Sequence, residues 1–173
     1  MKKFRRLSLG VFAAAALVAL PAPGQADVCG ESHTTPLIAG QHYTSGAIRI
    51  ANDESNIYVQ YQTDEPWFIS EAHAAAASTL DGIAQSKTGN PIPGRFAYSA
   101  TFDPEVSTYT FVIPISGLFT EGSTVYVAAH AVVQARKSAG GSQTAWGQGP
   151  DFPGNNWATY MMYTLQSCSG GNS

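Results

Sequence analysis

Apolar and polar residues alternate with a period of two along much of this chain. The clearest case is IYVQYQT at 57–63, which follows the polar turn NDESN at 52–56. Strict alternation over such a length is typical of a half-buried β-strand. Similar β-rich segments, separated by runs rich in Gly, Pro and Asn, predict further strands at 46–51, 67–75, 95–102, 107–115, 123–135 and 156–165.

Seven strands at fairly regular spacing, with no clear helical period between them, favour one fold class. We expect a single all-β domain over 27–168, built as an antiparallel β-sandwich of about seven strands. The last five residues, SGGNS at 169–173, are predicted to form a disordered tail.

One segment, WFISEAHAAAASTL at 67–80, fits two structures. Its alanines favour a helix, whereas its aromatic start and β-rich surroundings favour a strand. We predict a strand to about Ala75, followed by a loop or short helical turn over 78–84. On a strand, Glu71 and His73 share one face with Trp67 and Ile69, while on a helix the pair would lie about 200° apart.

A second histidine lies in the predicted strand at 123–135. Alternation puts Tyr126, Ala128, His130 and Val132 on one face of this strand. The opposite face is wholly apolar and therefore belongs in the core; it comprises Val125, Val127, Ala129, Ala131 and Val133.

If these two strands are neighbours, Glu71, His73 and His130 converge. Two imidazoles and a carboxylate suit a divalent metal such as zinc, and the same groups can act as acid, base or orienting residue. Two other interpretations stay open: an internal hydrogen-bond network within the sandwich, and direct contact with a ligand. A metal is the one cofactor that the sequence suggests.

The first 26 residues have the pattern of a secretory signal peptide. Basic residues at 2–6 precede the apolar stretch VFAAAALVAL, and PAPGQA then offers small residues before a cleavage site after Ala26. We therefore expect a secreted protein, periplasmic or extracellular in a bacterium. The apolar stretch is shorter than the roughly 20 residues of a membrane-spanning helix, and no second one follows.

Charge argues against one class of partner. Four of the nine Lys and Arg residues and none of the twelve Asp and Glu residues lie in the leader, so the remaining chain carries 5 − 12 = −7. A nucleic-acid partner would require a basic surface, so none is expected.

The chain has two cysteines, Cys29 and Cys168, near the two ends of the predicted domain. In an oxidising compartment they are expected to form a single disulfide. Closing a loop of this size contributes about 4–5 kcal/mol on the chain-entropy model, as an upper bound.

Five motifs in fixed order give the chain a resemblance. The segments WFISEAH, GNPIPGRF, VYVAAHAVV, TAWGQG and NNWATYMMYTL are similar to those of a group of secreted microbial β-rich proteins. Its motifs read T-E-T-H, G-N-P-x-P-G-x-F, A-A-H-A, E-T-A-W-G and N-W-A-T-Y-F. The resemblance covers about 38–165, implies a β-rich extracellular domain, and marks Glu71, His73, His130 and Trp146 as motif positions. It implies no particular activity and no catalytic residues.

The chain departs from this group at three positions. Gln143 stands where the group has Glu before T-A-W-G, and Ser70 and Ala72 replace the two threonines of T-E-T-H. If that Glu serves the group as a metal ligand or base, Gln143 puts this function in doubt for the present chain.

The segment TAWGQGPDFPGNNWATYMMY at 144–163 combines aromatic and amide side chains. Trp146 and Trp157, with Asn155 and Asn156, can form a ligand-binding patch, because flat rings stack on sugar faces and amides bond hydroxyls. The alternative is that the tryptophans fill the sandwich core. For Trp157 the core is favoured, while Trp146 is expected in a glycine-flanked loop.

Familiar catalytic motifs are missing from the sequence. It contains no G-x-S-x-G elbow, no phosphate-binding loop and no H-E-x-x-H. We therefore predict a secreted, non-catalytic binding or extracellular-matrix-type protein that presents its aromatic and amide patch to a glycan or cell-surface ligand. Two alternatives are a metal-dependent enzyme or metal-binding protein using Glu71, His73 and His130, and a purely structural module.

Overall fold

The computed structural model describes residues 28–136 and 141–168. Within them, nine strands form one antiparallel sheet with the order β5-β4-β7-β8-β1-β2-β3-β6, and β9 pairs with β7 beyond the end of β8. The strands are β1 (His33–Ala39), β2 (Tyr43–Asn52), β3 (Asn56–Thr63), β4 (Trp67–Ala77), β5 (Tyr98–Val106), β6 (Thr108–Pro114), β7 (Thr124–Ala135), β8 (Ser142–Gly147) and β9 (Met161–Thr164).

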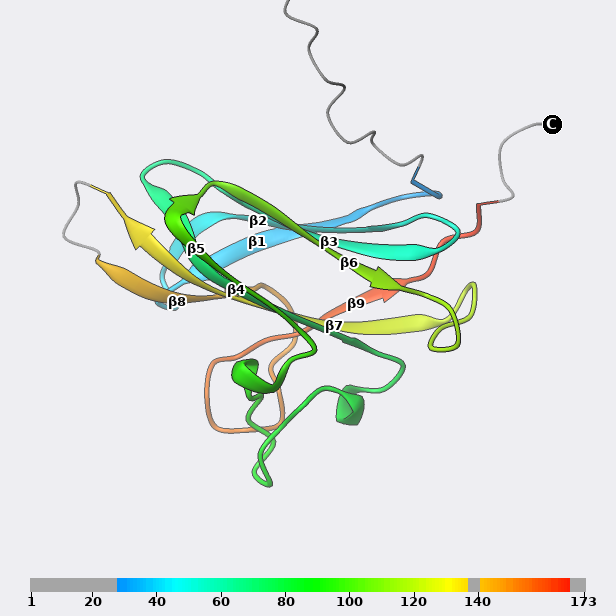
Figure 1. Ribbon diagram of the computed structural model, residues 1–173. Helices are drawn as coiled ribbons and strands as arrows, with labels where there is room; N and C mark the ends of the chain where they lie inside the picture. Colours follow the sequence, from blue (N-terminus) through cyan, green and yellow to red (C-terminus); the bar gives the residue numbers. More distant parts are fainter. Residues whose placement is uncertain (1–27, 137–140, 169–173) are drawn as a thin grey trace, which may run out of the picture.

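The sheet folds over itself into two facing layers. β1, β2, β3 and β6 form one layer, and β4, β7, β8 and β9 lie beneath it (Figure 1). The short β1–β8 pairing joins the layers on one side. On the other side, Ser107 alone separates β5 from β6, the two ends of the strand order. The predicted all-β antiparallel fold is confirmed.

The sequence analysis did not predict two of the strands, β1 and β8. β1 contains Pro36, and β8 is only six residues long between glycines, so neither shows a long alternating run. The ambiguous segment is a strand, as predicted, and a short 3₁₀ helix, η1 (Leu80–Gly82), follows it.

Two predictions fall outside the described residues, namely the signal peptide at 1–26 and the tail at 169–173. Within 28–136 and 141–168, no helix has the length and apolar character needed to cross a membrane.

The main core lies between the two layers. Ile48, Ile50 and Val59 from the upper layer meet Ile69 and Val127 from the lower layer, and all five are fully buried. The face of β7 predicted as core is confirmed, because Val125, Val127, Ala129, Ala131 and Val133 all belong to this cluster. Alternation therefore identified the inward side of β7 correctly.

A β-bulge in β4 corrects one prediction. The register against β7 shifts between Ile69 and Glu71, so two residues of β4 face one residue of its partner. A bulge moves every later side chain to the opposite face. Trp67 and Ile69 therefore point into the main core, whereas Glu71 and His73 lie on the outer face. The sequence had put all four on one face.

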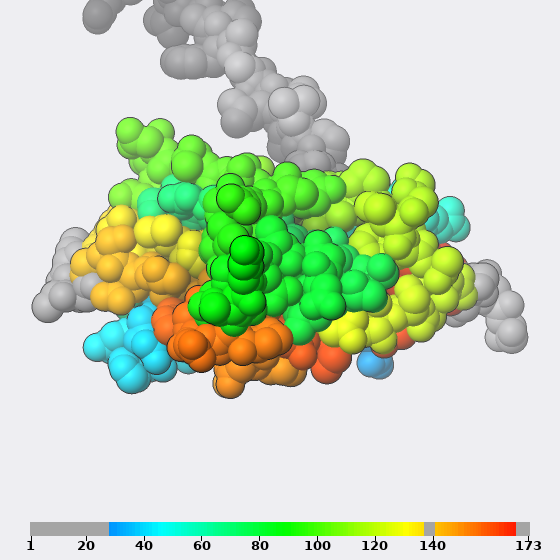
Figure 2. All heavy atoms as spheres, turned by 90° about the horizontal axis from the view of Figure 1, so that it is seen from below, coloured from blue at the N-terminus to red at the C-terminus, as the bar shows by residue number. Residues whose placement is uncertain are grey.

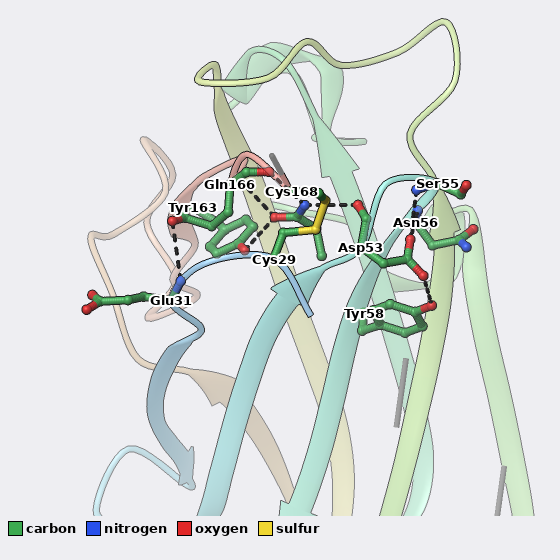
Figure 3. The surroundings of a disulfide bond; sticks show 10 residues. Cys29, Glu31, Asp53, Ser55, Asn56, Tyr58, Tyr163, Gln166 and Cys168 are labelled. Carbon is green, nitrogen blue, oxygen red and sulfur yellow. Dashed lines mark hydrogen bonds between the residues drawn. A yellow bond between two sulfur atoms is a disulfide. The ribbon is translucent and has the colours of Figure 1, made fainter. Parts of the chain in front are cut away.

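The predicted disulfide between Cys29 and Cys168 is confirmed, and it joins positions 139 residues apart (Figure 3). A buried amide supports this junction. The Oδ1 atom of Asn52 accepts hydrogen bonds from the Tyr163 hydroxyl at 2.7 Å and the Gln166 backbone N–H at 2.8 Å. The Cys29 N–H donates to the carbonyl of Asn52 at 2.7 Å. The first and last described segments are thus held to the end of β2.

Two long loops cover the outer face of the lower layer. Residues 78–97, which include η1 and η2 (Pro93–Arg95), and residues 148–160 hang below β4 and β7 in Figure 1. They lie side by side when this face is viewed directly (Figure 2). A second apolar cluster fills the space beneath them, and we call it the outer cluster; it comprises Ala75, Ile83, Phe96, Ala128, Trp146, Phe152 and Ala158.

Candidate functional site

Three aromatic side chains form a row across the outer face of the sheet. His73 on β4 is directly opposite His130 on β7, which is directly opposite Trp146 on β8. The ring centroids lie 5.4 Å apart between the two histidines and 4.8 Å apart between His130 and Trp146. The structure therefore brings the predicted pair of histidines together, as adjacent strands required.

Glu71 completes the predicted set through His73. The Nε2 atom of His73 lies 2.5 Å from Oε1 of Glu71, so with an ionised carboxylate this nitrogen is the donor. The Glu71 side chain is 40% exposed and that of His73 is 10% exposed. From the other layer, the buried Tyr61 hydroxyl donates to the carbonyl of His73 at 2.7 Å. The strand under the pair is thereby fixed to the main core.

Each of the two imidazoles has a buried nitrogen without a hydrogen-bond partner among the described residues. These nitrogens are Nδ1 of His73 and Nδ1 of His130. A buried polar atom without a partner costs about 1–3 kcal/mol. Burial, with a smaller contribution from the charge of His73, lowers the pKa of His130 to about 4. His130 is therefore a neutral ring at pH 7.

The donor set of the predicted metal site is only partly assembled. In the part of the chain that the structure describes, no group of three or more His, Cys, Asp or Glu side chains is arranged to hold a metal ion. Glu71 bonds Nε2 of His73, so this nitrogen is not available as a ligand. The arrangement resembles a hydrogen-bonded network more closely than a tetrahedral zinc centre.

Trp146 does not lie in a loop, as the sequence had suggested, but on strand β8. Its side chain is 4% exposed. Its ring is contacted by Phe96 and Phe152 from the two covering loops, each with centroids 6.4 Å away. Because these loops cover it, the ring offers no open face to a sugar. Trp146 is a core residue of the outer cluster.

The rest of the predicted patch lies in the loop 148–160. Trp157 is half-buried against the outer cluster, and Asn155 and Asn156 are exposed. Asn156 accepts a hydrogen bond from the Ala158 N–H at 3.3 Å through its own side chain. The amides are therefore at the surface, but the aromatic platform predicted beside them is largely buried.

A close junction joins the two covering loops. Oδ1 of Asn90 accepts a hydrogen bond from the Asn156 N–H at 3.0 Å. At Gly89, with φ of +80°, an added Cβ would lie 3.0 Å from the backbone nitrogen of Gly154. At Gly154, an added Cβ would lie 2.1 Å from Oδ1 of Asn90. Only glycine fits at positions 89 and 154, where the two loops pass this close to each other, so the loops are tightly packed at the junction.

A groove of about 690 Å³ opens beside this junction. The loop 78–97 supplies most of its wall, and Pro153 comes from the other loop. Its polar and charged lining consists of Asp81, Gln85, Ser86, Lys87, Thr88 and Arg95. Asn155 and Asn156 follow Pro153 along the chain, so the predicted amides lie near this groove.

The sequence analysis did not single out the groove residues. The signal available was QSKTGN at 85–90, a polar run leading into the breaker sequence GNPIPG. Its backbone forms a narrow turn, because the Ser86 N–H bonds the Asn90 carbonyl at 2.8 Å and the Ile92 N–H bonds the Ala84 carbonyl at 2.9 Å. Such a turn presents its tip to solvent.

No family model matches this sequence, and comparison with curated proteins finds no match. A solved structure described as "a putative carbohydrate binding protein from Bacteroides uniformis ATCC 8492" is 10% identical, with a TM-score of 0.37. The similarity covers 75% of this chain and 57% of that chain. The chain thus spans little more than half of that protein, and the similarity is too weak to carry an argument about function.

Proposed function

We propose that this is a binding protein that takes a polar ligand, a glycan, in the groove formed mainly by the covering loop 78–97. The observation that carries the proposal is the groove itself, about 690 Å³ in volume, with a wall of amide, hydroxyl and charged side chains. Hydroxyl-rich ligands are recognised by such groups when a rigid scaffold holds them in place. Secretion and the cell-surface setting remain part of the proposal.

Two features of the fold support a binding role for these loops. The outer cluster packs beneath both loops, and two of its residues, Ile83 and Phe152, are only 1% and 2% exposed. The loops are also joined at the surface by Asn90 and Asn156. Loops fixed in this way are preorganised, which reduces the conformational entropy lost on binding.

The test uses a steric block. The Thr88 side chain lines the groove and is exposed, so Thr88→Trp fills the groove without burial of a new ring in the core. Thr34→Trp changes an exposed threonine on β1 in the same way and serves as the matched control.

Both variants and the wild type are applied to an array of immobilised polysaccharides. We expect the wild type to bind at least one polysaccharide, Thr88→Trp to bind it at least about tenfold more weakly, and Thr34→Trp to bind normally. A wild type that binds nothing on the array, or an equal loss in both variants, would contradict the proposal.

A second candidate function is metal binding by Glu71, His73 and His130. The observation that favours it is the pair of buried Nδ1 atoms without protein partners, on two imidazoles whose centroids are 5.4 Å apart. Neutral imidazole nitrogen is a common ligand of zinc and copper. The two Nδ1 atoms could bind a metal with the Glu71–His73 hydrogen bond intact, whereas use of Glu71 as a third ligand would require that hydrogen bond to open.

Native mass spectrometry after incubation with zinc or copper tests this second candidate. Binding predicts one metal per chain, lost in His73→Ala and in His130→Ala but kept in His33→Ala, which changes an exposed histidine on β1. If the wild type takes up no metal, the three side chains are a structural network.

A further inference from the structure

The few basic residues of the chain are unevenly distributed. The described residues contain four Lys and Arg against eleven Asp and Glu, a net charge of −7. Two of these four cations, Lys87 and Arg95, line the same groove. On an acidic protein, two cations in one concave site create a local field that favours anions.

The groove cations also differ from the other two in their contacts. Arg136 pairs with Glu105 at 3.0 Å and lies 3.9 Å from the ring centroid of Phe68. Arg49 is half-buried on β2. Lys87 and Arg95 are exposed, and within 28–136 and 141–168 neither side chain has a hydrogen bond or an ion pair to another residue.

Two hydroxyl groups flank one of these cations in the sequence. The hydroxyls of Ser86 and Thr88 are 3.0 Å apart, on either side of Lys87 in the sequence. Asp81 is the one carboxylate in the wall, so the groove carries two positive charges and one negative charge. This combination suits a ligand with several hydroxyls and an acidic group.

We infer that the ligand is an anionic polysaccharide whose carboxylate or sulfate ester is bound by Lys87 and Arg95. The inference rests on the proposed function and specifies its ligand class. The ammonium of Lys87 and the guanidinium of Arg95 supply charge-assisted hydrogen bonds to the acidic group. Ser86 and Thr88 face the sugar hydroxyls, whereas the side-chain nitrogen of Gln85 donates to the carbonyls of Leu80 at 2.8 Å and Ile83 at 3.3 Å and so holds the loop.

Three soluble probes separate the possible chemistries. Polygalacturonate carries carboxylates, dextran sulfate carries sulfate esters, and dextran is neutral. Binding of each is measured by calorimetry for the wild type and for K87Q/R95Q. The matched control is R49Q/R136Q, which removes two positive charges outside the groove. Thermal unfolding establishes that each variant is folded.

We expect the wild type to bind polygalacturonate or dextran sulfate, and the probe that binds identifies the acidic group. K87Q/R95Q should lose at least about tenfold in affinity, since charge-assisted hydrogen bonds are lost. R49Q/R136Q should stay within about twofold. Asp81→Asn should strengthen binding by about two- to threefold, because it removes the negative charge in the wall.

Two results would overturn the inference. If dextran binds as tightly as the anionic probes and K87Q/R95Q has no effect, the cations play no part, yet a binding role for the groove survives. If R49Q/R136Q weakens anion binding as much as K87Q/R95Q does, the attraction comes from overall charge. Failure of the proposed function itself is judged separately, by the array and the Thr88→Trp variant.

Discussion

The molecule has two apolar cores, and they arise in different ways. The main core lies between two layers of strands, and regular alternation along those strands produces it. The outer cluster lies between the sheet and two irregular loops, and its residues come from scattered positions such as Ile83, Phe96 and Phe152. The outer face of β4, β7 and β8 is therefore buried beneath the loops, although it points away from the main core. The proposed binding surface accordingly lies on the loops.

The difference changes how the motif residues are interpreted. His73, His130 and Trp146 lie on the face that alternation alone would leave to solvent, yet as whole residues they are only 4–8% exposed. They are buried because the loops cover them. Their place in the fold is beneath the proposed ligand surface, and the groove residues lie above them.

The largest expected effect concerns the outer cluster. Trp146→Ala should lower the free energy of unfolding by about 3–5 kcal/mol, because a buried indole in contact with both loops is lost. Urea denaturation measures the change. Val112→Ala, at a half-exposed position on β6, is the control and should cost much less. A loss below about 1 kcal/mol for Trp146→Ala would mean that the ring is not a core residue.

The second prediction concerns pH. The pKa of His130 is lowered to about 4 in the folded state, chiefly by burial, against an ordinary value of 6.5. Between these values the unfolded state binds more protons, so stability falls as the pH falls from about 6.5 to about 4. The loss is about 3 kcal/mol, and it is absent above pH 6.5.

Urea denaturation at pH 7.5 and pH 4 checks this sign. His130→Gln should lose less stability than the wild type over the same range, because its amide does not titrate. His33→Gln, at an exposed position, should behave as the wild type does. Equal pH dependence in the wild type and His130→Gln would show that burial of the His130 ring does not control its protonation.

The third prediction compares the two cores with one substitution. Ile83 in the outer cluster and Ile113 in the main core are both 1% exposed. Each Ile→Ala change should cost about 2–5 kcal/mol, with Ile83→Ala cheaper by about 1–2 kcal/mol, because loops relax around a cavity more easily than paired strands. Proteolysis should cleave Ile83→Ala within 78–97 or 148–160 while the strands stay protected. Equal costs and cleavage would show that the two cores are equally rigid.

The smallest expected effect is at the junction of the two loops. Asn90→Ala removes the acceptor of the Asn156 N–H and should cost about 1 kcal/mol. Hydrogen exchange of the Asn156 amide should accelerate, while amides of β7 should not change. Unchanged exchange at Asn156 would show that the junction does not depend on this hydrogen bond.

The sequence predicted the main core well, for a physical reason. On β7 the inward and outward side chains differ clearly in polarity, and the neighbouring strand brought His73 to His130 as expected. The bulge after Ile69 could not be predicted, because it depends on pairing with β7 and no glycine marks it. It explains why Glu71 and Ile69 lie on opposite faces.

The outer cluster and the groove were harder to predict. Loop residues follow no period, so nothing in the sequence links Ile83 to Phe152 or Gly89 to Gly154. For the same reason the sequence analysis put Trp146 in a loop: β8 is short, and the loops that bury Trp146 are distant in sequence. Asn155 and Asn156, the amides of the predicted patch, are exposed, so ligand contact through them stays a prediction.

The central claim is that ligand binds on the covering loops and nowhere on the strands. The most direct test is an NMR titration of the ¹⁵N-labelled protein with an oligogalacturonate. The account predicts amide shift changes confined to 81–95 and 153–156, with the strands of the upper layer unaffected. Changes centred on β1, β2, β3 or β6, or binding with no change in these two loop segments, would contradict it.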